Sequence, residues 1–136
     1  MSKLSSSTGT VLAAVVVVAA AGCHPANPIV GKWQITQTVM GAQLTVTREF
    51  KSDGTESLTN PAGMDAQMHY TIEGNELHER ATAITIAGHT ITIDASSPAN
   101  AQKEIVETFA VDGDKLTLDN KSTGVSVTQT YIRVPS

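Results

Sequence analysis

Apolar and polar residues alternate along most of the chain after Ile29, and this period of two predicts β-strands. Successive side chains of a strand point to opposite faces, so alternation gives each strand one buried and one wet face. Gly, Asn, Asp, Ser and Pro separate the alternating runs, as turns between strands require. The pattern therefore predicts an all-β domain over residues 29–136, with nine short strands and no helix.

Two similar segments predict how neighbouring strands pair. The first, Tyr70-x-Ile72-x-Gly74-Asn75-x-Leu77, aligns with the second, Phe109-x-Val111-x-Gly113-Asp114-x-Leu116. A two-residue loop at Gly113-Asp114, with glycine first, sets Val111 opposite Leu116. The same loop sets Phe109 opposite Leu118 and keeps all four side chains on one face.

Strands joined by short turns form an antiparallel up-and-down meander. A meander of about eight or more strands tends to close into a barrel, because closure removes its open edges. We therefore expect eight to nine strands that form a small barrel. The apolar side chains expected inside it, and to line a ligand if the barrel is hollow, are Ile35, Val46, Phe50, Met68, Tyr70, Ile72, Phe109, Val111 and Leu116.

Charged residues on the strands raise a separate question. Arg48 falls on the inward face of its strand, together with Phe50. Either the expected register is wrong there or Arg48 lies at a strand end; the alternative is that Arg48 is a buried charge that needs a carboxylate partner. The glutamates are expected on polar strand faces, outside any pocket; they are Glu73, Glu76, Glu79, Glu104 and Glu107.

The first residues have the layout of an export signal. Lys3 precedes an apolar run over residues 11–21, which ends in small residues before Cys23. A membrane-spanning helix needs about 20 apolar residues, and this run is shorter. We therefore predict a signal peptide over residues 1–22 and a short extended tether over residues 23–28.

The segment Ala21-Gly22-Cys23 resembles the lipobox of bacterial lipoproteins. The resemblance implies that Cys23 is the lipid attachment site, acylated by chains such as palmitate, and the first residue of the mature protein. It also implies an exported protein anchored in the cell membrane or outer membrane, with His24 favouring the outer membrane in a cell that has two membranes. The alternative is a plain secretory signal that leaves Cys23 as a free thiol.

The net charge and the cysteine count limit the classes of partner and the cross-links that the domain can have. The formal net charge is −4 and becomes one unit more negative once Lys3 is removed with the signal. An acidic surface argues against nucleic acid as a partner. Because Cys23 is the single cysteine, the domain forms no internal disulfide and is held together by burial.

Three motifs of the mature chain resemble the lipocalin-like domains of bacterial lipoproteins, which belong to the calycin superfamily. These are Val30-Gly31-Lys32-Trp33, Phe50-x-x-Asp53-Gly54-Thr55 and Tyr131-Ile132-Arg133-Val134. The resemblance implies that Trp33, after Gly31, plugs the closed end of a barrel. It also implies that Arg133 from the last strand lies across Trp33.

Reaction chemistry is not indicated. The chain lacks a Gly-x-Ser-x-Gly turn, and His69 and His78 share an outward face without a close-spaced third ligand. We expect no enzyme activity, no metal and no cofactor. Two functions remain: a membrane-anchored binding module for a small apolar ligand, or an envelope structural or protein-interaction module whose barrel is filled. An internal cavity of several hundred Å³ would favour the first.

Overall fold

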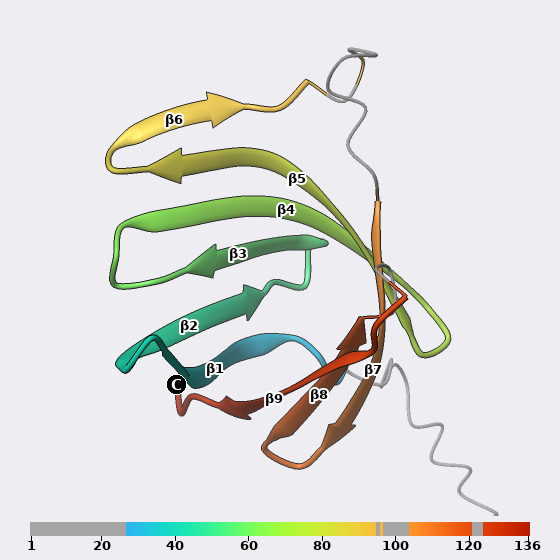
Figure 1. The fold of residues 1–136 in the computed structure, drawn as a ribbon. Coiled ribbons are helices and arrows are strands. Elements are labelled where there is room, and N and C mark those ends of the chain that lie inside the picture. Colours follow the sequence, from blue (N-terminus) through green and yellow to red (C-terminus); the bar gives the residue numbers. More distant parts are fainter. Residues whose placement is uncertain (1–26, 95, 97–103, 121–123) are drawn as a thin grey trace, which may run out of the picture.

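The structure is a computed structural model that describes residues 27–94, 96, 104–120 and 124–136. The predicted signal peptide and Cys23 lie outside the described residues. Within those residues the chain forms nine strands and no helix, which confirms the all-β prediction (Figure 1). The strands are β1 (Gly31–Val39), β2 (Ala42–Phe50), β3 (Thr55–Thr59), β4 (Met64–Glu73), β5 (Glu76–Ile86), β6 (His89–Thr92), β7 (Ile105–Asp112), β8 (Lys115–Asn120) and β9 (Val127–Arg133). The described part of the chain accordingly holds no helix of the length and apolarity that crossing a membrane requires.

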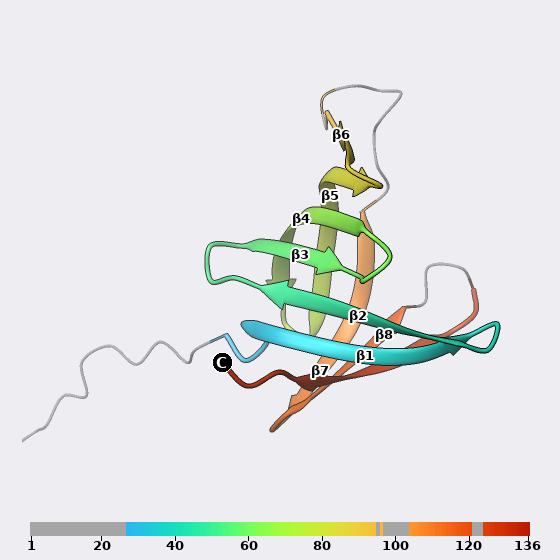
Figure 2. The ribbon, with the colours of Figure 1, turned by 90° about the vertical axis from the view of Figure 1, so that its left-hand side faces the viewer.

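Eight of the nine described strands close into an antiparallel barrel, as the meander predicts. Strands β1 to β5 pair in chain order, β5 then pairs with β7, and β7, β8 and β9 follow. The ring closes where β9 returns to β1, with Trp33 opposite Arg133 and Gln34 opposite Ile132. Figure 2 shows β1 and β2 crossing in front of β7 and β8, with the barrel interior between them.

Strand β6 stands outside the ring. Residues 83–86 of β5 pair with β6, whereas residues 76–79 of β5 pair with β7. The long β5 pairs with β4 along both parts, and on its other side its first part pairs with β7 and its second part with β6 (Figure 1). All four residues of β6 are exposed.

The predicted hairpin register is confirmed. Val111 lies opposite Leu116 and Phe109 lies opposite Leu118. Gly113 has a φ of 57°, in the left-handed region that a glycine-first turn uses. This register directs every second side chain of β7 and β8 to the interior.

The buried core includes residues at the end of the barrel where β1 begins. Its buried members are Ile29, Trp33, Phe50, Tyr70, Leu77, Leu116, Leu118 and Tyr131. The rings of Phe50 and Tyr70 meet edge to face with their centres 5.3 Å apart, a favourable arrangement for aromatic pairs. We call the end that contains Ile29, Trp33 and Arg133 the closed end.

Candidate functional site: a charged cavity inside the barrel

The closed end is held by contacts between the first and last strands. The guanidinium carbon of Arg133 lies 4.1 Å from the centre of the Trp33 ring. Arg133 Nη1 donates to the carbonyl of Val30 and Nη2 to that of Pro28, each at 3.1 Å. The Trp33 indole N–H donates to the Ile29 carbonyl at 2.8 Å. The arginine therefore joins the last strand to the segment that precedes the first.

Gly31 leaves room for this arginine. Its φ of 137° lies in a region that side-chain-bearing residues rarely adopt, and a Cβ at this position would lie 2.6 Å from Arg133 Nη1. The structure thus brings Gly31, Trp33 and Arg133 together, the three residues that the sequence resemblance groups at the barrel closure.

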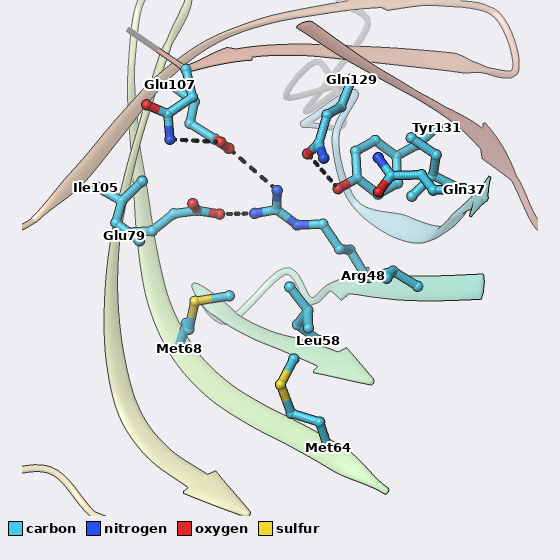
Figure 3. A pocket seen from close by; sticks show the side chains of 13 residues that line it. Gln37, Arg48, Leu58, Met64, Met68, Glu79, Ile105, Glu107, Gln129 and Tyr131 are labelled. Carbon is cyan, nitrogen blue, oxygen red and sulfur yellow. Dashed lines mark hydrogen bonds and ion pairs between the residues drawn. The ribbon is translucent and has the colours of Figure 1, made fainter. Parts of the chain in front are cut away.

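Beyond the core, the interior contains a cavity of about 300 Å³. This volume is at the lower end of the range for small-molecule pockets, roughly 300–1,000 Å³. Most of its lining is apolar, and the apolar side chains include Ile35, Val46, Leu58, Met64, Met68 and Ile105. Figure 3 shows Leu58, Met64 and Met68 on one side of the cavity, facing the charged groups.

The structure divides the residues predicted to line a ligand into two groups. Ile35, Val46 and Met68 line the cavity. The other six lie in the core or against it; they are Phe50, Tyr70, Ile72, Phe109, Val111 and Leu116. The second group occupies strand positions nearer the closed end, where large side chains fill the interior.

Arg48 forms the charged part of the cavity. Its Nε donates to Glu56 Oε1 at 2.6 Å, its Nη1 donates to Glu107 Oε2 at 3.2 Å, and its Nη2 donates to Glu79 Oε1. All four side chains are buried. Of the two interpretations of Arg48, the structure shows the buried charge with carboxylate partners. One guanidinium thus ties together β2, β3, β5 and β7.

Two aromatic rings also contact this guanidinium. Its carbon lies 5.1 Å from the ring centre of Phe50 and 5.7 Å from that of Tyr131. Such distances are within the range of cation–π attraction. The Tyr131 hydroxyl donates to Gln129 Oε1 at 3.0 Å, so the phenol is also fixed on its polar side.

Burial and neighbouring charges shift the acid–base equilibria of the cluster. Burial alone lowers the pKa of Arg48, but the charges of Glu79 and Glu56 outweigh it and hold that pKa well above its usual value. Burial raises the pKa of Glu79 to about 10; Arg48 opposes this, and a hydrogen bond with Glu56 adds to it. Burial and the neighbouring carboxyl groups thus favour the protonated form of Glu79, whereas Arg48 favours its ionised form.

The carboxyl groups of the cluster outnumber its one guanidinium. Arg48 supplies one positive charge, and three carboxyl groups surround it. An excess charge in a buried site is costly unless something pairs with it.

The expected position of two glutamates was wrong. Glu79 and Glu107 are only 2% and 7% exposed and point into the barrel, not onto polar strand faces. The signal was present in the sequence, because Glu79 is two residues from Leu77 and Glu107 two residues from Phe109. The inward position of Glu56 was harder to predict, because β3 is short. It follows only from the pairing of Glu56 with the buried Met68.

The histidines lie elsewhere. Thr71 pairs with His78 and His69 with Arg80, so the two histidines are diagonal neighbours, as the register predicts. His78 has Glu76 and Glu104 within 3.6 Å and 3.5 Å of its ring nitrogens. In the part of the chain that the structure describes, no group of three or more His, Cys, Asp or Glu side chains is arranged to hold a metal ion.

Comparisons of the chain with family models, curated protein sequences and solved structures give no significant match. The fold and the cavity are compatible with a lipocalin-like barrel, and the functional argument below starts from their geometry.

Proposed function

We propose that this protein is an exported, lipid-anchored envelope lipoprotein whose lipocalin-like barrel binds a small ligand. The observation that carries the binding proposal is the cavity of about 300 Å³ inside a closed barrel. A filled interior would instead favour a structural or protein-interaction module. The cavity therefore favours the binding module over that alternative.

The anchoring part of the proposal rests on the sequence. A signal-like segment ends in Ala21-Gly22-Cys23, and acyl chains on Cys23 would hold the barrel at a membrane through the tether. Two or more chains give stable anchoring, whereas one chain binds a membrane only marginally. In this arrangement the barrel stays close to the membrane and samples molecules present there.

We propose binding and not catalysis, because the ionisable groups of the cavity are engaged with one another. Arg48 holds Glu56, Glu79 and Glu107 in one cluster. A general acid or base must instead be within hydrogen-bond reach of a substrate proton. The cluster is better suited to setting the charge that a ligand must have.

Fractionation of cells tests the anchor. We expect the wild-type protein in the membrane fraction and the Cys23→Ser protein outside it. Wild-type protein that is soluble and carries no acyl chain would contradict the anchoring proposal.

Mass spectrometry of the protein, extracted gently from its own membrane, tests binding. We expect a small molecule to accompany the wild-type protein and to be absent from Met68→Trp, in which the indole occupies the cavity. Met40→Trp is the matched control, because Met40 is fully exposed. If no small molecule accompanies the wild-type protein either, the result would count against a ligand.

A further inference from the structure

We propose that the cavity selects a small amphipathic cation, with an ammonium or amidinium group on an aliphatic body. This inference rests on the proposed ligand-binding function and adds the chemical class of the ligand. It follows from the number of carboxyl groups in the cluster, from their bonds to all three guanidinium nitrogens of Arg48 and from the apolar wall opposite.

All three nitrogens of the Arg48 guanidinium already donate to carboxyl groups. Each nitrogen donates to a different one: Glu56, Glu79 or Glu107. An anionic ligand would compete with these three carboxyl groups for the guanidinium and would bring a negative charge beside them. Anions such as fatty-acid carboxylates are therefore disfavoured.

Glu107 is the carboxylate best placed to receive a cation. It lines the cavity, and its contacts are long, with Arg48 Nη1 at 3.2 Å and Asn120 Nδ2 at 3.4 Å. Charge-assisted bonds from nitrogen to carboxylate are usually about 2.7–2.9 Å. By contrast, Glu56 is bound at 2.6 Å and does not line the cavity. A ligand ammonium beside Glu107 would offset the negative charge of its carboxylate.

The opposite wall fits an aliphatic body. Leu58, Met64 and Met68 face Glu79 and Glu107 across the cavity (Figure 3). Methionine side chains are flexible and polarizable, so they adapt to ligands of different shape. A cavity of about 300 Å³ suits a chain of moderate length, and eight-carbon probes are suitable.

Three probes of equal chain length separate charge from apolar contact: octylammonium, octanol and octanoate. The protein is the full chain with Cys23→Ser, with ¹³C on its methionine methyl groups. Met64 and Met68 line the cavity and report binding there, whereas the fully exposed Met40 reports non-specific attraction to the acidic surface. Single Met→Leu variants assign the signals.

We expect octylammonium to shift the Met64 and Met68 signals saturably and to bind about tenfold or more tightly than octanol, with octanoate weakest. Equal or tighter binding of octanol or octanoate would overturn the cation proposal and leave ligand binding intact. If no probe shifts either signal, the proposed binding function fails as well. The order of the three affinities is measured on the Cys23→Ser protein alone, so it tests the proposal even if a cavity variant folds poorly.

Glu107→Gln tests the residue that we assign to the cation. We expect it to weaken octylammonium binding by about tenfold or more and to leave octanol binding within about twofold. Glu49→Gln, an equal change of charge on the outer face of β2, should leave both affinities unchanged. Loss of octylammonium preference in Glu49→Gln, or its retention in Glu107→Gln, would overturn the assignment.

Discussion

The Arg133 guanidinium lies over the Trp33 ring, 4.1 Å from its centre, although the two residues belong to the last and the first strands. Arg133 and Trp33 also face each other in the strand pairing that closes the barrel. The stability of the closed end therefore depends on both side chains together.

Trp33→Ala should lower the free energy of unfolding by about 3–5 kcal/mol, the usual cost of emptying a core aromatic site. Arg133→Ala should cost less, and the two losses should fall short of additivity by about 0.5–2 kcal/mol, because they remove one shared contact. Urea denaturation of the double-mutant cycle measures this, with the exposed Lys32→Ala as the control. Fully additive losses would mean that the two side chains are not coupled.

Gly31→Ala should destabilise the protein by about 1–3 kcal/mol, because it forces an unfavourable φ and places a methyl group against Arg133. Gly41→Ala is the control: Gly41 also has a positive φ, of 81°, but nothing lies within 4 Å of an added Cβ. We expect Gly31→Ala to cost more than Gly41→Ala in thermal unfolding, and Arg133→Ala to reduce the excess. Equal costs in the two glycine variants would show that Arg133 does not crowd Gly31.

The barrel topology was predictable from local patterns. Alternation and turn residues predict nine strands, and the glycine-first loop at Gly113-Asp114 predicts that Val111 faces Leu116. Hairpin pairing depends on neighbouring residues, so it can be inferred from a short window. The position of β6 could not be inferred in this way, because it depends on how β5 divides its two parts between β6 and β7.

The charged cluster was only partly predictable. Alternation places Arg48 on the inward face with Phe50, and the same reasoning applied to Leu77 and Phe109 would have placed Glu79 and Glu107 there too. Glutamates generally lie at the surface, and this general rule led to the opposite placement of Glu79 and Glu107. The contacts of Arg48 with Glu79 and Glu107 could not be inferred, because these residues lie 31 and 59 positions away along the chain.

Glu79→Gln should change how stability depends on pH. The pKa of Glu79 is about 10 in the folded protein against an ordinary value of 4.5, so the folded state holds a proton that the unfolded state releases. The stabilisation from this group is complete below pH 4.5 and is lost as pH rises toward 10. As pH rises, the free energy of unfolding of the wild type should therefore fall relative to that of Glu79→Gln, by at most about 1.4 kcal/mol per pH unit.

Urea denaturation of both proteins from about pH 5 to about pH 9 measures how the difference in their free energies of unfolding changes with pH. Glu49→Gln, on the outer face of β2 and 41% exposed, is the matched control and should preserve the wild-type slope. The glutamine of Glu79→Gln can still donate to Glu56 and accept from Arg48, so it imitates the neutral acid. Parallel pH profiles for wild type and Glu79→Gln would show that Glu79 is ionised in the folded protein.

The central claim, that the barrel interior is an accessible ligand cavity, is tested most directly by a single thiol placed in its wall. The Cys23→Ser background removes the only native cysteine, and Met64→Cys then places a thiol in the cavity. We expect iodoacetamide to alkylate this thiol and octylammonium to protect it saturably, while the exposed control Met40→Cys reacts without protection. A Met64→Cys thiol in the folded protein that fails to react, or that octylammonium, octanol and octanoate all fail to protect, would contradict the account.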